Sequence, residues 1–260
     1  MTKKISDSVQ GEGASWIFLH GWGMHSGIWQ PLLATLSNSL RIRTIDLPGF
    51  GDSPWHADYA DFEQAVTALE KHLLEHEPGP VNIMGWSMGG LYAIALAARQ
   101  TLNVQRVALI ASTPKFSQEP SWPGIQANVL AMFQKQLSRD FRATIERFLA
   151  VQAMGSPHVK RDIRLMHELL ADGAEPNPEA LIAGLKWLQE IDLRPQFESL
   201  TCPTLRLYGR RDSLVPIRQA ELLQKPIDHI EIFAESAHTP FLNERERFCQ
   251  ALIEFSERSV

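Results

Sequence analysis

Residues 81–90 read VNIMGWSMGG and run into LYAIALAA at residues 91–98. The apolar start predicts a strand, the glycine-rich centre a sharp turn, and the end a helix. Gly85 and Gly89 flank Ser87 in a G-x-S-x-G pattern, and their small size lets the backbone fold tightly around the serine. The pattern therefore predicts an exposed, nucleophilic Ser87 at the turn. The alternative is a plain glycine turn that packs the helix against the strand.

A serine nucleophile needs a base and an orienting acid, and candidates for both follow strands later in the chain. Residues 204–208 predict a short buried strand, and Asp212 lies in the loop after it. Residues 229–233 predict a second strand, which leads into the loop of His238. One known triad arrangement has the chain order serine, acid, histidine. We therefore predict that Ser87, Asp212 and His238 are catalytic; the alternatives are a turn-forming aspartate and a packing histidine.

Asp46 is the rival acid, because it also ends a predicted strand, residues 41–45. It precedes Ser87 in the chain, however, and the turn that follows, residues 47–53, is typical of a structural loop. His20 likewise follows a predicted strand, but it does not come after an acid in the required order. We therefore expect Asp46 and His20 to lie outside the triad.

An oxyanion hole should combine two backbone N–H groups near the nucleophile. Met88, directly after Ser87, is expected to provide the first from the start of the helix. The predicted strand at residues 16–19 runs into His-Gly-Trp-Gly, where the glycines on either side allow the N–H of Trp22 to turn inwards. Trp22 and Met88 are the predicted donors, and a simple glycine turn is the alternative for the first loop.

Composition indicates a compact enzyme. The chain has 260 residues, is 44% hydrophobic and has a net charge of −5 at pH 7, which suits one α/β domain with an insertion. No apolar run approaches the roughly 20 residues of a membrane span, and the N-terminus lacks the apolar core of a secretion signal. Cys202 and Cys249 show no metal or redox spacing, so a reduced, cytoplasmic setting is expected.

The alternation of strands and helices is interrupted once. It holds over residues 1–113 and resumes over residues 201–260, which we predict to form one core. Residues 114–200 instead read as amphipathic helices separated by turns, which predicts a helical lid over the carboxyl edge of the sheet. Residues 131–165 within it contain seven basic and three acidic residues, which leaves +4. This charge favours docking of an acidic partner; an ordinary solvated helix surface is the alternative.

The order of these motifs along the chain resembles that of the α/β-hydrolases. The shared features are the HGWG loop, the DLPGFGDS turn, the GWSMGG turn, and the loops of Asp212 and His238. Segments 121–125, 146–152 and 205–209 further resemble the family of pimeloyl-[acyl-carrier protein] methyl ester esterases of biotin synthesis, over nearly the whole chain. The resemblance implies a mostly parallel sheet flanked by helices, an inserted helical lid, and a monomeric serine carboxylesterase with no metal or organic cofactor.

The resemblance also implies a substrate and a partner. The substrate is the methyl ester of a carrier-bound dicarboxylate, and the partner is acyl carrier protein, which is small and acidic. The implied docking residues are Arg142, Arg147, Lys160 and Arg164, with Arg142 standing beside Ala143, where a basic residue is expected. Substrate contacts are implied for Trp22, Ser87, Met88, Phe148, Leu149, Ala150, Val151, Gln152 and His238.

Other functions remain open at this point. Within the same fold, the chain could be a general short-chain carboxylesterase that needs no carrier, or a carbon–carbon bond hydrolase. A non-catalytic ligand receptor or scaffold with this fold is a hypothesis from another class, and the intact Ser87, Asp212 and His238 disfavour it. Nucleic acid is disfavoured as a partner, since the net charge is acidic and no binding motif is present.

Overall fold

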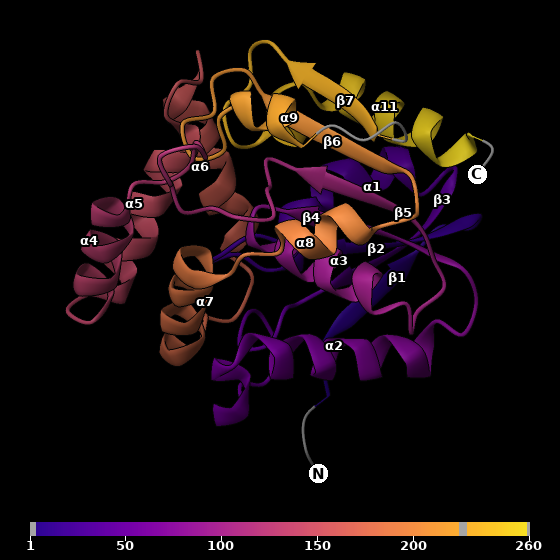
Figure 1. The fold of residues 1–260 in the computed structure, drawn as a ribbon, viewed down its shortest axis with the longest axis horizontal. Helices are drawn as coiled ribbons and strands as arrows, with labels where there is room; N and C mark the ends of the chain where they lie inside the picture. The colour runs from indigo at the N-terminus through magenta and orange to yellow at the C-terminus, as the bar shows by residue number, and fades with distance from the viewer. Residues whose placement is uncertain (1–3, 224–227, 259–260) are drawn as a thin grey trace.

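A seven-stranded sheet forms the centre of the part of the chain that the computed structural model describes, residues 4–223 and 228–258 (Figure 1). Its strand order is β1-β3-β2-β4-β5-β6-β7, and each pair of neighbours is parallel except β1 and β3. The predicted α/β class with a mostly parallel sheet is therefore confirmed. The strands are β1 (Asp7–Gln10), β2 (Ala14–Leu19), β3 (Leu40–Ile45), β4 (Val81–Trp86), β5 (Val104–Ile110), β6 (Thr204–Gly209) and β7 (Asp228–Phe233).

Helices cover both faces of the sheet, which is why its central strands are largely buried and mostly apolar. In β2, Ile17 and Leu19 pack into the core cluster that includes α2 and α3, whereas Trp16 and Phe18 pack into the cluster that includes α1 and α11. No helix within the described ranges is long and apolar enough to cross a bilayer. The covering helices are α1 (Gln30–Leu36), α2 (Phe62–His76), α3 (Met88–Arg99), α8 (Arg194–Ser199), α9 (Arg218–Leu222), α10 (Pro240–Asn243) and α11 (Arg245–Glu257), with short 3-10 turns η1 (Ser26–Trp29) and η2 (Ala57–Ala60).

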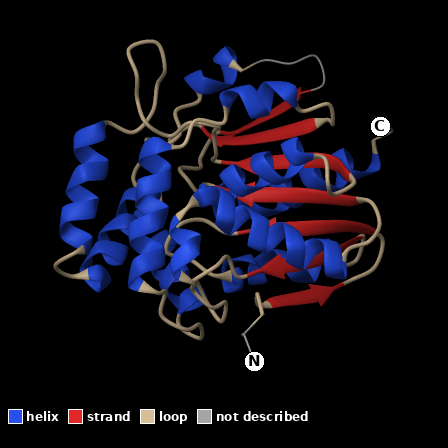
Figure 2. Cartoon of the chain, turned by 60° about the horizontal axis from the view of Figure 1, so that its bottom comes forward, coloured by secondary structure: helices blue, strands red, loops and turns tan. Residues whose placement is uncertain are grey.

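Four helices between β5 and β6 stand apart from these layers, and we call them the helical insert. They gather at the end of the sheet to which the parallel strands point (Figures 1 and 2). Helix α8 follows them in the chain but packs against α3 in the layer over the sheet, although residues 114–200 were expected to form a lid. The insert consists of α4 (Ala127–Leu137), α5 (Phe141–Ala153), α6 (Val159–Leu170) and α7 (Pro178–Glu190).

A polar network fastens the edge of the sheet to α2. Asp7 on β1 pairs with Arg43 on β3, and Glu77 after α2 accepts from the Arg43 Nε at 2.6 Å. His72 on α2 lies beside it, with its Nε2 3.5 Å from an Asp7 carboxylate oxygen. Burial, and then electrostatic repulsion from the neighbouring His76 and Arg43, lower the pKa of His72 from 6.5 to about 4. The folded protein therefore holds a neutral His72 near neutral pH.

We expect the free energy of unfolding to fall as pH drops from about 6.5 towards 4. Over this range the unfolded chain protonates His72 and the folded chain does not, so acid favours unfolding. The loss should reach about 1 to 2 kcal/mol near pH 5 and vanish above about pH 7. Urea unfolding of the wild type and of His72→Gln, at about pH 5 and at about pH 7, measures this loss of stability. An equal pH dependence in the two proteins would contradict the assignment to His72.

Candidate active site

Ser87 occupies a strained turn between β4 and α3. Its φ of 53° and ψ of −121° lie outside the favoured regions for an L-residue. A Cβ on Gly85 would lie 2.3 Å from the Gly89 carbonyl oxygen, and a Cβ on Gly89 would lie 2.3 Å from the Leu19 carbonyl oxygen. The N–H of Ser87 donates to the carbonyl of Ile110 on β5 at 2.9 Å. Glycine is therefore required on both sides of a turn that the neighbouring strands hold in place.

Three loops at the carboxyl ends of the strands bring Ser87, His238 and Asp212 into one chain of hydrogen bonds. The Ser87 Oγ lies 2.9 Å from the His238 Nε2, and the His238 Nδ1 lies 2.8 Å from the Asp212 Oδ2. The other carboxylate oxygen of Asp212 accepts from the backbone N–H groups of Leu214 at 2.8 Å and Val215 at 3.1 Å. These contacts fit the tautomer in which Nδ1 carries the proton and Nε2 accepts from the serine hydroxyl.

This arrangement can deliver a nucleophilic serine oxygen. The His238 side chain is positioned to take the hydroxyl proton of Ser87, and the carboxylate of Asp212 stabilises the imidazolium that results. Ser87 is 3% exposed and His238 is 1% exposed, so the serine is buried and not exposed as the G-x-S-x-G pattern predicted. The charges of the reaction would therefore develop away from bulk water. Such a site suits attack on a carbonyl carbon.

The loop of His238 is held from both sides. The Trp86 Nε1 donates to the His238 carbonyl oxygen at 2.9 Å. The backbone N–H of His238 donates to the carbonyl of Gln152 in the insert helix α5 at 3.2 Å. A backbone hydrogen bond therefore joins the insert to the loop that carries the candidate base, His238.

The two predicted oxyanion donors, Met88 and Trp22, belong to two segments that approach Ser87. Met88 is the first residue of α3, where the N–H groups of a helix point outward without helical partners. The loop after β2 passes close to the serine, since a Cβ on Gly21 would lie 3.2 Å from the Ser87 Cβ. Trp22 follows in this loop, and its ring is fixed by a 2.9 Å hydrogen bond from Nε1 to the Leu181 carbonyl oxygen.

The sequence is similar to known proteins over nearly its whole length. The sequence profile described as the alpha/beta hydrolase fold matches residues 17–244. The chain belongs to the α/β-hydrolase family. This α/β-hydrolase is 42% identical over 258 residues to the pimeloyl-[acyl-carrier protein] methyl ester esterase of Vibrio vulnificus (strain YJ016), covering 98% of this chain and 99% of that one. The esterase of the same name from Vibrio cholerae (strain El Tor Inaba N16961) is 42% identical over 263 residues, with 99% and 100% covered. The resemblance drawn from the motifs is confirmed.

Solved structures agree on the fold. The esterase EaEST from Exiguobacterium antarcticum superposes with a TM-score of 0.87 at 24% identity, covering 98% of this chain and 96% of that chain. A bromoperoxidase from Bacillus anthracis gives a TM-score of 0.88 at 19% identity, with 98% and 95% covered. At this identity the likeness establishes the α/β-hydrolase fold and nothing about the reaction.

In this α/β-hydrolase, Asp46 and His20 accept hydrogen bonds from the backbone of neighbouring loops. Both lie outside the hydrogen-bonded chain of Ser87, His238 and Asp212. The two carboxylate oxygens of Asp46 accept from the backbone N–H groups of Ser26 at 2.8 Å and Asp52 at 3.0 Å. The His20 Nε2 accepts from the N–H of Leu47 at 2.9 Å. Burial lowers the pKa of His20 to about 4, so the ring is neutral and able to accept. Their structural role agrees with the expectation from chain order.

Sequence reasoning missed one buried residue at the serine turn. Ser112, after β5, donates its hydroxyl to the carbonyl of Ser87 at 2.7 Å. It follows Ala111, whose positive φ of 41° turns the chain towards the serine. A Cβ on Gly90 would lie 2.0 Å from the Ser112 hydroxyl oxygen, so the two segments are in close contact. A lone serine carries no sequence signal of this role, because the contact joins two different strand ends.

We expect Ser112→Ala to lower kcat about tenfold, with KM within about twofold, because the turn loses one of the hydrogen bonds that fix it. Ester hydrolysis and the rate of fluorophosphonate labelling of Ser87 measure the effect. Ser156→Ala is the matched control, since the buried Ser156 hydroxyl bonds Asp162 in the insert and not the serine turn. An unchanged kcat in Ser112→Ala, or an equal loss in the control, would contradict this role.

The implied substrate residues on α5 differ in their surroundings. Phe148 is buried, with its ring centroid 4.7 Å from that of Trp22. Leu149 and Gln152 are also buried, whereas Ala150 and Val151 are half-buried. The Gln152 side-chain oxygen has no hydrogen-bond partner among the described residues. Such an acceptor is costly to leave unpaired and is available to a polar group of a ligand.

The four implied docking residues are exposed on the insert. Arg142 pairs with Glu175 at 2.7 Å, and Arg164 lies 3.8 Å from Glu168. The Arg147 Nη1 donates to the Gln136 side chain at 2.7 Å. We call these four side chains the basic surface of the insert; they are solvated, and their ion pairs are weak enough to exchange for a partner's carboxylates.

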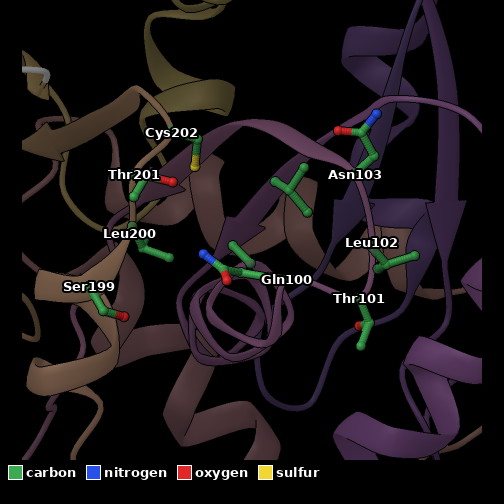
Figure 3. Close-up of a pocket in the computed structure, with 10 residues that line it drawn as sticks. Gln100, Thr101, Leu102, Asn103, Ser199, Leu200, Thr201 and Cys202 are labelled. Carbon is green, nitrogen blue, oxygen red and sulfur yellow. The ribbon is translucent and has the colours of Figure 1, made fainter.

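A pocket lies at the end of the sheet opposite to the one that carries Ser87, Asp212 and His238 (Figure 3). It has a volume of about 340 Å3 and lies between the turn that precedes β5 and the segment that precedes β6, residues 100–104 and 199–202. Parallel strands place these residues at the amino end, whereas Ser87, Asp212 and His238 all follow strands. The pocket in Figure 3 is therefore remote from the candidate triad.

Proposed function

We propose that this protein is a serine carboxylesterase that hydrolyses the methyl ester of pimeloyl-acyl carrier protein in the cytoplasm and releases methanol. The observation that supports the reaction type is the unbroken hydrogen-bonded chain from Ser87 through His238 to Asp212. The support for the substrate is full-length similarity to esterases that bear this name. The insert, which bonds to the His238 loop, is proposed to act as the lid.

The mechanism divides the hydrolysis into two acyl transfers. The Ser87 oxygen attacks the ester carbonyl as His238 takes its proton, and the N–H groups of Met88 and Trp22 stabilise the oxyanion. The bond to the methoxy group then breaks, and His238 returns the proton so that methanol leaves. Water attacks the acyl-enzyme, again with His238 as base, and frees a carboxylate while Ser87 regains its proton. No metal or organic cofactor enters these steps.

The proposal requires that only one of two reactive carbonyls reaches Ser87. The substrate carries a methyl ester at one end and the carrier thioester at the other, and the thioester must survive. Docking of the carrier on the insert, outside the buried serine, would hold the thioester away from the nucleophile. The partner is therefore part of the specificity of the reaction.

We expect charge reversal of the basic surface, Arg147→Glu, Lys160→Glu and Arg164→Glu combined, to raise KM for the carrier-bound ester by roughly tenfold or more at low salt. Hydrolysis of p-nitrophenyl acetate should stay unchanged, because that ester needs no carrier. Reversal at Lys71 and Arg218, exposed outside the insert, is the control. Equal KM values in all three proteins would show that the basic surface is merely solvated.

Mass spectrometry of methyl-pimeloyl carrier protein tests the function itself. Incubation with the wild type should remove the methyl group and leave the thioester intact, and incubation with Ser87→Ala should leave both. An unchanged carrier with active wild-type enzyme would overturn the substrate assignment and favour a general short-chain carboxylesterase.

A further inference from the structure

Trp86 is the last residue of β4 and directly precedes Ser87. Its side chain is fully buried in an aromatic cluster on one face of the sheet. Its ring centroid lies 5.1 Å from that of Phe241 and 6.3 Å from that of Trp29, and both pairs are edge to face. Phe241 belongs to α10, which begins shortly after His238. The Trp86 ring is therefore packed beside the segment that carries the candidate base.

Two hydrogen bonds join the neighbours Trp86 and Ser87 to one residue, His238. The Trp86 Nε1 donates to the His238 carbonyl oxygen at 2.9 Å, and the Ser87 Oγ lies 2.9 Å from the His238 Nε2. The first bond holds the main chain of the base, and the second engages its ring. The indole is a rigid ring with only two side-chain torsions, so its bond fixes the His238 main chain relative to the end of β4.

Trp86 also borders the loop after β2. A Cβ added to Gly21 would lie 3.2 Å from the Trp86 Cε3 and 3.2 Å from the Ser87 Cβ, so the backbone of Gly21 lies against both residues. The same loop continues to Trp22, the proposed second oxyanion donor. One indole therefore borders the segments that carry the candidate nucleophile, the candidate base and the candidate oxyanion donor.

Trp29 shows what packing alone requires in this aromatic cluster. It is fully buried and packs against Phe241, as Trp86 does. Its Nε1, however, has no hydrogen-bond partner within residues 4–223 and 228–258. The two tryptophans thus share burial and an aromatic neighbour, and they differ in the use of the indole N–H. Packing in the cluster does not need this donor, whereas the His238 loop receives it.

We propose that Trp86 is a positioning residue, whose indole N–H keeps the His238 imidazole within hydrogen-bond reach of Ser87. The inference rests on the proposed roles of Ser87 and His238 and adds a residue that acts through the main chain of the base. Proton transfer requires the base nitrogen within about 3 Å of the hydroxyl oxygen. A misplacement of about 1 Å costs roughly a hundredfold in rate, so loss of the bond should appear in kcat and not in KM.

Trp86→Phe tests this bond. Phenylalanine keeps an aromatic ring in the cluster and removes the donor to the His238 carbonyl. With p-nitrophenyl butyrate we expect kcat to fall about tenfold or more while KM stays within about twofold. Fluorophosphonate labelling of Ser87 should slow by a similar factor, because it also needs the base. Trp29→Phe is the matched control: it removes the same atoms from the same cluster without loss of a hydrogen bond, and its kcat should stay within about twofold.

A second variant removes the donor and keeps the shape of the side chain. Benzothienylalanine, in which sulfur replaces the indole N–H, is placed at position 86 by codon expansion. We expect it to reproduce the loss of kcat, with urea unfolding close to that of the wild type. A kcat within about twofold of the wild type in this protein overturns the positioning role, because a loss in Trp86→Phe would then reflect packing. An equal loss in Trp29→Phe overturns it as well.

Failure of the proposed function is recognised separately. Wild-type enzyme that leaves the methyl-pimeloyl carrier intact would reject the substrate, and the p-nitrophenyl butyrate series would still report on Trp86.

Discussion

Ser87→Ala is expected to lower kcat for ester hydrolysis by about a millionfold. The variant removes the only oxygen that the His238 Nε2 contacts within the triad, at 2.9 Å, so no acyl-enzyme can form. The residue stays small, and the hydrogen bonds of the Ser87 backbone to Ile110 and Ser112 do not involve the lost hydroxyl. Stability should therefore change little, which separates loss of chemistry from loss of fold.

Steady-state hydrolysis of p-nitrophenyl butyrate measures this loss, and fluorophosphonate labelling followed by intact mass measures covalent capture. The wild type should gain one adduct and Ser87→Ala none. A variant that retains more than about a thousandth of the wild-type kcat would contradict a nucleophilic Ser87 and favour another attacking group.

Asp212→Asn is expected to lower kcat by about ten thousandfold, and the structure gives a specific reason. The N–H groups of Leu214 and Val215 both donate to one carboxylate oxygen of Asp212, so they will hold the amide oxygen of asparagine in that place. Its NH2 group then faces the His238 Nδ1. That nitrogen must accept, the proton moves to Nε2, and the ring can no longer take the proton of Ser87.

Asp46→Asn is the matched control for this variant. Asp46 is a buried aspartate at the end of β3 and accepts two backbone N–H groups, one on each oxygen. Its amide can accept only one of them, so the free energy of unfolding should fall by about 1 to 3 kcal/mol with kcat nearly unchanged. The pH profile of kcat, together with urea unfolding, separates the two. A kcat for Asp212→Asn within tenfold of the wild type would reject the tautomer argument.

Local sequence patterns predicted most strands that position the site. Residues 16–19, 41–45, 204–208 and 229–233 and the apolar start of residues 81–90 were expected as strands, and each lies within a strand of the sheet. Buried parallel strands give continuous apolar runs that are easy to recognise. The short β1 was not expected, because its DSVQ sequence is polar and largely exposed, and it is a strand only through its pairing with β3.

The candidate site, like the sheet, was predicted only in part. The G-x-S-x-G pattern determined the place of Ser87, because glycine on both sides is a local steric requirement that the sequence records directly. Chain order favoured Asp212 over Asp46, but two aspartates that end strands look alike in sequence. Their difference lies in which groups reach their carboxylates: both accept backbone N–H groups, but the ring of the candidate base His238 reaches only Asp212.

The sequence by itself therefore determined the fold class and the turn around Ser87, and it predicted the chain order of the candidate triad, since these depend on turn chemistry and on short periodic patterns. Only the tertiary structure decided which side chains meet. The contacts of Ser112 with the Ser87 carbonyl and of the Gln152 carbonyl with His238 join segments distant in the chain. Such contacts are set by the packing of the insert on the sheet, and no single segment carries a local energetic signal of them.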